Sequence, residues 1–468
     1  MNPRRLFVAS CFALIATAMA FSIRADIIPA LKTDFGFTGA QMGLVAGTGL
    51  WGFAITIVLG GMLVDAFGMG RLMAIAFLGH VSGVFLTIFA QGFTSLYVAT
   101  LLIGLANGLV EAVINPLAAT LYPQSKTKHL NILHAWWPGG LIIGGLMGFA
   151  LTKLMALDAQ GVSLAALSLG WKIKMLFVLI PTFIYGALLL GQKFPETERV
   201  ATGVSYGEMW REAFRPMLLV FIGLMVLTAA TELGPDQWVG NLLQNLVGIQ
   251  GVLLLVYTAG IMFVLRFFFS GLVVSKLGPL GVLIASSALS ALGLYALSSA
   301  QTALTVFAAA TIFGMGKTYF WPTMLGVVSE RFPRGGALVM ALMGGAGMFS
   351  AGFLMVHAMG SIQDYYAVKH LSPQTRQLVV TGTGLDEKKA LIAGEVDAAV
   401  RAEVEAAKQY SAVMTYRWVA AIPAFLVFAF AALYLYFRAQ GGYQAVSIHQ
   451  SGRQRHGVGG RRQTPLPA

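Results

Sequence analysis

Long apolar stretches separated by short polar connections run through most of the chain. Most of these stretches reach the roughly 20 residues that cross the hydrocarbon core of a bilayer as a helix. Charged residues fall mainly between the stretches, whereas a water-soluble protein would spread them over its surface. The pattern predicts twelve transmembrane helices, at residues 6–30, 40–64, 71–91, 95–121, 130–153, 172–193, 216–234, 250–275, 280–299, 302–327, 336–360 and 412–437.

The first apolar stretch has the composition of a secretory signal. Basic MNPRR precedes the apolar LFVASCFALIATAMA, which ends in small residues suited to cleavage. However, the apolar run continues to Pro29, and eleven further stretches follow it. We therefore expect this segment to be the first transmembrane helix and to remain uncleaved.

Two connections are longer than the others. Residues 194–215 form a charged middle loop, which predicts a six-helix bundle at 1–193 and a second one at 216–438. Residues 361–411 form an insertion, predicted to be extracytoplasmic, whose second part has the pattern of a polar helix leading into the last span. Residues 439–468 are predicted to be a disordered, basic cytoplasmic tail.

Composition and charge support a membrane protein with both termini inside the cell. The chain is 57% hydrophobic and 11% charged, with a net charge of +12. Lys and Arg concentrate in the loops on the side of the N-terminus, and the short loops on the other side hold only Lys32, Lys153, Lys172 and Lys174. By the positive-inside rule both termini are cytoplasmic, in an inner membrane whose anionic lipid attracts the basic face. The charge therefore requires no nucleic-acid partner.

Two segments of the first half recur in the second half. GMLVDAFGMGR begins at Gly61 and GLVVSKLGPLG begins at Gly271, a shift of 210 positions. GLVEAVINP begins at Gly108 and GMGKTYFWP begins at Gly314, a shift of 206. Parallel repeats of six helices, with a binding site between them at mid-membrane, are a known transporter arrangement. The repetition predicts an all-α membrane protein made of two pseudo-symmetric six-helix bundles.

The loop pattern formed by Gly61, Asp65, Gly68 and Arg71 resembles the signature of the major facilitator superfamily, and the twelve spans fit that superfamily over nearly the whole chain. Two longer segments, GLANGLVEAVINPLAATLYPQSKTKHLNILHAWWPGG and YFWPTMLGVVSERFP, resemble the fucose permease type of sugar:proton symporter. The matching positions in the first of these segments include Glu111, Asn115, Pro116, Leu130 and Asn131. The resemblance implies the major facilitator fold and proton-coupled transport by alternating access.

Charges inside the apolar stretches are the strongest candidates for function, because each costs roughly 2.5–3.5 kcal/mol or more in a membrane helix. Glu111 lies near the middle of its stretch, where apolar surroundings favour the neutral acid, so proton binding there can accompany conformational change. Lys317 occupies the equivalent position in the second half. We hypothesise that the two interact and that protonation of Glu111 releases Lys317 to bind substrate. The alternative is a permanent ion pair that only holds the halves together.

Two further residues are candidates for proton coupling. Asp26 lies near the outer end of the first stretch, close to Arg24, and is either an entry site for protons or an ordinary interfacial acid. His134 follows the connection between the fourth and fifth stretches and titrates near neutral pH unless its surroundings change that. Its alternative role is hydrogen bonding to neighbouring helices.

Several polar and aromatic residues are candidates for contact with substrate. Their side chains offer hydrogen bonds to hydroxyl groups or flat rings for the apolar faces of sugars, although helix packing and membrane-interface roles are the alternatives. The candidates are Asn115, Asn131, Lys317, Tyr319, Trp321, Trp136 and its neighbour Trp137, together with Gln237 and Trp238 in a polar break of the seventh stretch. Arg266 and Lys276 are predicted to be gate or loop residues near the cytoplasm.

The sequence argues against catalysis. It contains no phosphate-binding GxxxxGK[ST] loop, and its seven histidines are scattered away from acids, so we expect no enzyme activity, no metal site and no cofactor. Our leading hypothesis is uptake of a monosaccharide or related polar solute with protons, by a monomer. The alternatives are a proton-coupled carrier of an organic anion or sugar acid, for which Arg24 and Lys317 would bind carboxylate, and drug efflux. A receptor or assembly factor with a transporter fold remains a further class.

Overall fold

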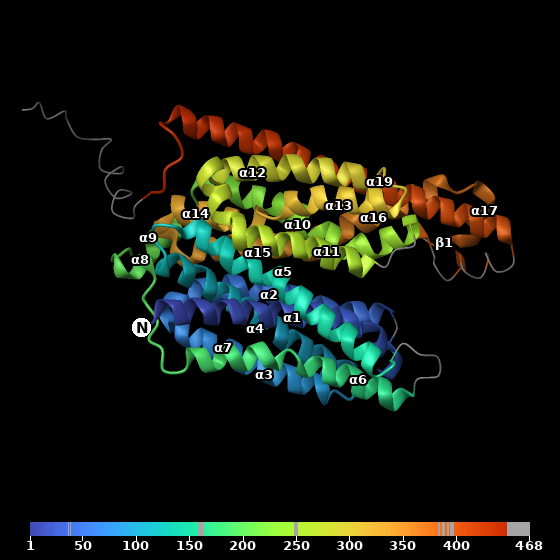
Figure 1. Ribbon diagram of the computed structural model, residues 1–468, viewed down its shortest axis with the longest axis horizontal. Helices are drawn as coiled ribbons and strands as arrows, with labels where there is room; N and C mark the ends of the chain where they lie inside the picture. The colour runs from blue at the N-terminus through green and yellow to red at the C-terminus, as the bar shows by residue number, and fades with distance from the viewer. Residues whose placement is uncertain are drawn as a thin grey trace, which may run out of the picture.

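The computed structural model describes residues 1–35, 37, 39–157, 163–247, 251–381, 384–385, 389–390, 393 and 397–446. Figure 1 shows the helices of the first half, in blue to green, packed side by side in one bundle, and those of the second half, in yellow to red, in another. The N-terminus and the middle loop lie at one end of both bundles, and the insertion lies at the opposite end. These ends are called the middle-loop end and the insertion end.

The first bundle contains six spans. The seventh helix, α7, continues the sixth span after a break at Phe177 and Val178, and this span begins at Leu164, eight residues before the predicted start. The helices are α1 (Pro3–Phe35), α2 (Gly39–Phe67), α3 (Met69–Ile88), α4 (Phe93–Leu121), α5 (Lys126–Leu154), α6 (Leu164–Leu176) and α7 (Leu179–Leu189).

The second bundle has several interrupted helices. Its elements are α10 (Pro216–Val247), α11 (Gly251–Val264), the π-helical turn η1 (Leu265–Phe269), α12 (Ser270–Leu297), α13 (Ala303–Lys317), α14 (Phe320–Arg331), the 3-10 turn η2 (Pro333–Gly335), α15 (Gly336–Phe349), the π-helical turn η3 (Ser350–Leu354), α16 (Met355–His370) and α19 (Ala398–Ala439). Within α12, Gly278 has a φ of 67°, which favours glycine, and Pro279 follows it. The chain reverses there from the eighth span to the ninth.

This reversal reconciles the observed and predicted numbers of spans. Among the described residues, eleven helical segments are long and apolar enough to cross a membrane, and one of them, Leu254–Leu297, contains the turn at Gly278. Eleven segments therefore correspond to the twelve predicted spans. The all-α membrane fold predicted from the sequence is confirmed.

The two long connections carry short elements of their own. The middle loop contains α8 (Glu198–Ala201) and α9 (Tyr206–Ala213). The insertion begins as a continuation of α16 and then forms α17 (Pro373–Val379) and a two-stranded antiparallel pair, β1 (Val380–Thr381) with β2 (Gly384–Leu385). As predicted, a polar helix leads into the last span, because α19 is continuous from Ala398. Most of the predicted basic tail, from residue 447 onward, lies outside the described residues.

The two bundles meet closely along α2 and α15 near the middle-loop end. A Cβ atom built at Gly61 would lie 2.1 Å from the Cβ of Ala341, and one at Gly345 would lie 2.3 Å from a methyl carbon of Val58. Neither distance is compatible with a side chain at these glycines. The missing side chains at Gly61 and Gly345 therefore allow the halves to close against one another at this end.

Candidate functional site

A cavity with an empty volume of about 320 Å³ lies between the two halves. Its walls combine aromatic and aliphatic side chains with four ionisable groups, two from each half. The lining residues are Phe53, Glu111, His134 and Trp137 from the first half and Glu232, Leu233, Arg266, Trp321 and Met348 from the second half. Such a mixture of apolar walls and a few convergent polar groups is typical of small-molecule sites.

On the first-half wall, Glu111 belongs to a short chain of hydrogen bonds. Asn115, four residues later on the same face of α4, donates from Nδ2 to Glu111 Oε2 at 2.7 Å. His134 Nε2, from α5, lies 2.8 Å from Asn115 Oδ1, so this nitrogen is the donor when the ring is neutral. His134 Nε2 is also 3.9 Å from Glu111 Oε2. The carboxylate on this wall is thus held by the amide of Asn115, with an imidazole nearby.

On the second-half wall, Glu232 of α10 is paired with a buried arginine. Arg266 Nη2, in η1, donates to Glu232 Oε1 at 2.6 Å, and Arg266 is 1% exposed. Glu232 Oε2 accepts a second hydrogen bond, 3.0 Å long, from the backbone N–H of Trp321. The acid on this wall is therefore held by a cation and by the start of α14.

Arg266 is further held by backbone groups of both halves. Its Nε donates to the carbonyl of Thr318, in the break between α13 and α14, and its Nη1 donates to the carbonyl of His134 at 3.1 Å. This position differs from the predicted gate near the cytoplasm. Arg266 precedes Lys276 by ten residues, or roughly 15 Å of helix, which carries it from the loop into the membrane interior.

Lys317 is fully buried at the end of α13. Its Nζ lies 5.2 Å from the centre of the Phe313 ring, and its charge acts on Glu232. The hypothesis that Lys317 pairs with Glu111 is untested by these contacts, which join Glu111 to Asn115 and His134. It stays a prediction.

Three other candidate residues pack between helices and are not among the residues that line the cavity. Asn131 donates to the carbonyl of Thr127 at 2.9 Å, and Tyr319 donates to the carbonyl of Leu265 at 2.8 Å. Trp136 packs edge-on against Phe263 and Phe267 of the opposite half, with ring centres 5.3 and 5.7 Å away. The neighbouring Trp137, on the next face of α5, lines the cavity instead.

Asp26 lies at the insertion end of α1, away from the cavity lining. Its Oδ2 accepts a 2.5 Å hydrogen bond from Lys174 Nζ, which also donates to Thr152. Arg24, two residues earlier in α1, lies over the ring of Phe21 at 5.3 Å. Its buried Nη2 has no hydrogen-bond partner within the part of the chain that the structure describes. The side chains of Gln237 and Trp238 lie outside the described residues.

Comparison with known proteins identifies the family. The sequence profile described as the Major Facilitator Superfamily matches residues 6–355. The chain belongs to this superfamily of membrane transporters. Among solved structures, the E. coli fucose:proton symporter aligns with 91% of this chain and 98% of its own, at 14% identity and a TM-score of 0.66. The proton:xylose symporter aligns with 92% and 95%, at 12% identity and a TM-score of 0.66. Both likenesses concern the fold alone.

Two curated superfamily relatives match a shorter part of the chain. A hexuronate transporter of Bacillus subtilis is 26% identical over 168 residues, which cover 34% of this chain and 35% of the relative. A protein named as a probable chloroplastic anion transporter of Arabidopsis thaliana is 29% identical over 184 residues, covering 36% and 34%. The chain therefore matches only about a third of the length of each curated relative.

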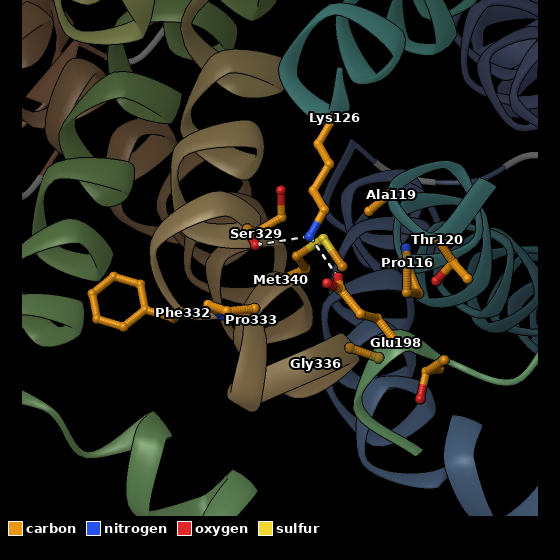
Figure 2. Close-up of a pocket in the computed structure, with 12 residues that line it drawn as sticks. Pro116, Ala119, Thr120, Lys126, Glu198, Ser329, Phe332, Pro333, Gly336 and Met340 are labelled. Carbon is orange, nitrogen blue, oxygen red and sulfur yellow. Dashed lines mark hydrogen bonds and ion pairs between the residues drawn. The ribbon is translucent and has the colours of Figure 1, made fainter. Parts of the chain in front are cut away.

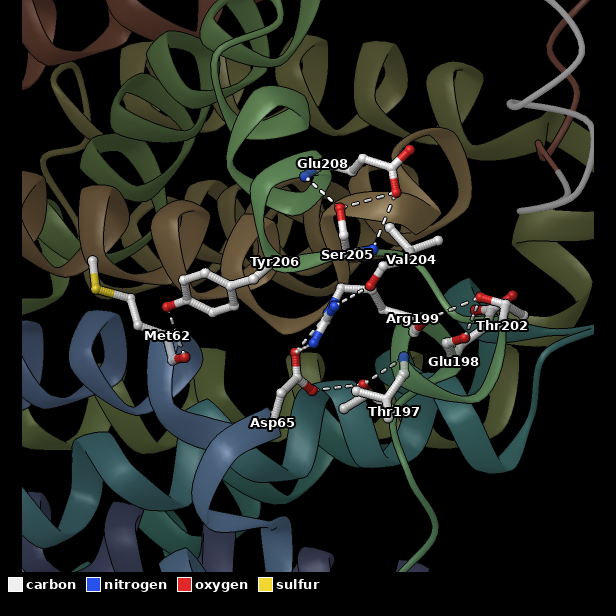
Figure 3. Close-up of polar contacts among 11 residues, drawn as sticks. Met62, Asp65, Thr197, Glu198, Arg199, Thr202, Val204, Ser205, Tyr206 and Glu208 are labelled. Atoms are coloured by element: carbon white, nitrogen blue, oxygen red, sulfur yellow. Dashed lines mark hydrogen bonds and ion pairs between the residues drawn. The ribbon is translucent and has the colours of Figure 1, made fainter.

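The loop signature of the superfamily lies at the middle-loop end, where Asp65 finds its partner in the middle loop. Figure 3 shows Arg199 bonding to Asp65 Oδ2 at 2.7 Å, while Thr197 donates to Oδ1 at 2.6 Å. Gly68 has a φ of 80°, which suits glycine at the turn into α3, whereas Arg71 is exposed. Lys276, in the equivalent segment of the second half, is exposed too. The sequence did not reveal the role of Arg199, because this contact spans 134 positions.

A second set of polar contacts closes the same end. Figure 2 shows Lys126, at the start of α5, reaching Glu198 Oε2 at 2.5 Å in a cavity bounded by α4, α14, α15 and the middle loop. Thr127 donates to Glu330 Oε1 at 2.6 Å, joining the first half to α14. Tyr443, just after α19, donates to the other oxygen of Glu330 at 2.7 Å, and its burial beside this acid raises the pKa of Tyr443 well above its usual value.

Among the described residues, no group of three or more His, Cys, Asp or Glu side chains is placed to hold a metal ion. Sequence reasoning did not single out Glu232, which lies just before the polar break at Gln237 and Trp238. The available signal was its position as an acid at the end of an otherwise apolar stretch.

Proposed function

We propose that this chain is a proton-coupled carrier of a small organic anion of the sugar-acid class, working by alternating access. The observation that carries the proposal is a pair of buried cations in the second half, one on the cavity wall and one near it. Arg266 is 1% exposed and lines the cavity, and Lys317 is 0% exposed close by. Charged residues inside membrane helices are costly, and those that face a cavity commonly mark the path of a substrate. A carboxylate is the anion whose planar oxygens suit a guanidinium.

The relatives support the same choice of substrate class. One relative is named a hexuronate transporter and another a probable anion transporter, and the chain matches about a third of each. A sugar acid combines a carboxylate with hydroxyl groups and an apolar ring face. The cavity offers a partner for each of these, in Arg266, in Glu111, and in the rings of Trp137 and Trp321.

Glu111 is the proposed carrier of the driving proton. It lines the cavity, is 2% exposed and is bonded to Asn115, a neutral group. An acid in such surroundings gains or loses its proton without breaking an ion pair. Its accessibility to either side of the membrane would then follow the alternating opening of the two halves.

A second candidate is proton-coupled uptake of a neutral monosaccharide. The observation in its favour is the pair of tryptophans, Trp137 and Trp321, that line the cavity on opposite walls. Flat rings of this kind stack on the apolar faces of sugars. In this case the Arg266–Glu232 pair would be structural and would persist throughout the cycle.

The test uses the purified full-length chain in liposomes that contain a trapped pH indicator. Glucuronate or galacturonate is added outside, and fucose, xylose and glucose are added in parallel. We expect internal acidification with the sugar acids, a smaller proton flux per substrate in Glu111→Gln, and no change in the exposed control Glu196→Gln. Acidification with a neutral sugar alone would favour the second candidate. Absence of any response to either class would refute both.

A further inference from the structure

The carboxylate of Glu232 occupies a binding site that the rest of the protein builds without it. One oxygen accepts from Arg266 Nη2 at 2.6 Å, and the other accepts from the backbone N–H of Trp321 at 3.0 Å. Trp321 is the second residue of α14, and the first N–H groups of a helix have no partner inside it. The site thus presents a guanidinium and a helix N-terminus to the two oxygens of one carboxylate.

The donors of this site are fixed independently of Glu232. Arg266 is anchored by the carbonyls of Thr318 and His134, one from each half. The break between α13 and α14 leaves Trp321 N–H free to donate, whatever group accepts from it. Lys317 adds positive charge near this carboxylate. Removal of Glu232 would therefore leave a preorganised receptor for a carboxylate.

The receptor also faces the cavity. Glu232, Arg266 and Trp321 all line the same cavity, together with Met348 and the first-half residues Glu111 and His134. A solute in the cavity can thus reach both donors by the path that the Glu232 side chain now fills.

We propose that Glu232 is an internal stand-in for the carboxylate of the substrate. The incoming carboxylate replaces Glu232 on Arg266 Nη2 and on the N-terminus of α14, and Glu232 moves aside. This inference rests on the proposed transport of an organic anion and deepens it, because it names the receptor and the group that competes for it.

Charge balance requires the displaced Glu232 to take up a proton. The ionisable groups that face Glu232 are Arg266 and Lys317 from its own half, with Glu111 and His134 across the cavity. A substrate carboxylate that takes over Arg266 adds one negative charge to a buried site, where an extra charge is costly. Glu232 then takes up one proton on a carboxylate oxygen, so that each anion enters with one compensating proton. When the anion leaves, Glu232 loses that proton and pairs with Arg266 again.

The first arm of the test does not depend on the identity of the substrate. The full-length Glu232→Ala variant in detergent is titrated with sodium formate, a free carboxylate small enough for the vacated space, with sodium chloride as the salt control. We expect formate to raise the temperature of unfolding of Glu232→Ala and to leave the wild type and the exposed control Glu196→Gln unchanged. An equal response to formate in all three proteins, or none in Glu232→Ala, would overturn the proposal.

The second arm uses Glu232→Gln, which keeps a side chain of nearly the same shape and so avoids the space that alanine leaves. Calorimetric titration with glucuronate in buffers of different ionisation enthalpy gives both the affinity and the number of protons taken up. Because the internal competitor is gone, we expect glucuronate to bind at least about tenfold more tightly than to the wild type. We also expect one proton fewer per bound anion. Unchanged or weaker binding with the same proton count would refute the stand-in.

The two arms separate this inference from the proposed function. If the wild type transports glucuronate but neither variant behaves as expected, the stand-in is wrong and anion transport stands. If formate stabilises Glu232→Ala while no sugar acid is bound or carried by any form, the receptor is real and the substrate class is wrong.

Discussion

Two acids project into the cavity from opposite halves, and they differ in the partners that hold them. Glu111 and Glu232 are each 2% exposed. Glu111 is bonded to the amide of Asn115, with the imidazole of His134 close by. Glu232 is bonded to the guanidinium of Arg266 and to a helix N-terminus. Equal burial thus comes with two different electrostatic settings.

The difference assigns different chemistry to the two walls. An acid among neutral groups can change its protonation state with little rearrangement of its neighbours. An acid held by a cation stays ionised until another anion takes its place, because removal of one partner leaves the other charge buried and uncompensated. The first-half wall is therefore suited to proton binding. The second-half wall is suited to anion binding, and it takes up a proton only when an anion displaces Glu232. Four substitutions test this division, from the largest expected effect to the smallest.

Substitution Arg266→Ala should have the largest effect on stability. It removes the cation bonded to Glu232 and leaves a buried carboxylate without its ion-pair partner, which costs about 3–5 kcal/mol. Chemical unfolding in mixed micelles, followed by tryptophan fluorescence, measures the change in the free energy of unfolding. The double variant Arg266→Ala/Glu232→Ala should recover much of the loss. A double variant no more stable than Arg266→Ala would argue against a tightly coupled pair.

Substitution Asn115→Ala should have an intermediate effect. It deprives both Glu111 and His134 of a hydrogen-bond partner, and buried polar groups left unpaired cost about 1–3 kcal/mol. The same unfolding assay applies. In a double-mutant cycle with Glu111→Gln, we expect a measurable coupling energy. Strict additivity of the two single changes would mean that the hydrogen bond between these residues contributes little.

Substitution Glu111→Gln should change stability by only about 1 kcal/mol, because glutamine still accepts a hydrogen bond from Asn115. Its effect should appear in coupling. We expect exchange of labelled substrate across the membrane to continue, while accumulation against a gradient driven by protons falls. Normal accumulation in this variant would remove Glu111 as the carrier of the driving proton.

Substitution Asp26→Asn should have the smallest effect. The carboxyl side chain is 33% exposed and pairs with Lys174 outside the cavity lining, and a partly exposed pair contributes about 1 kcal/mol or less. Proton flux per substrate, measured in liposomes, should match that of the wild type. Loss of coupling would instead support Asp26 as an entry site for protons and would move part of the coupling away from the two cavity walls.

The sequence predicted the fold better than the site, for physical reasons. Hydrophobic length is a local property, so the spans were recognisable, including the eighth and ninth, which the turn at Gly278 separates. The sequence did not show which face of each helix points to the cavity. Adjacent Trp136 and Trp137 have different neighbours, because one residue turns the helix by about 100°.

Contacts between distant segments were equally hidden from the sequence. Glu232 and Arg266 lie 34 positions apart, and their pairing depends on the π-helical turn at 265–269 and on the broken helix at Thr318. The pairing of Asp65 with Arg199 of the middle loop likewise has no local signal. Residue types that a membrane helix tolerates poorly were visible, but the partners that stabilise them depend on the folded arrangement.

The absence of a side chain at Gly61 offers a means of choosing between states of the transport cycle. A methyl group at this position would meet the methyl group of Ala341 at 2.1 Å, a contact that two packed helices cannot accommodate without moving apart. Substitution Gly61→Ala would therefore prevent α2 and α15 from packing closely at the middle-loop end. This would bias the molecule toward the conformation that is open there. A single added carbon would provide a trapped form for imaging the cavity from the opposite side.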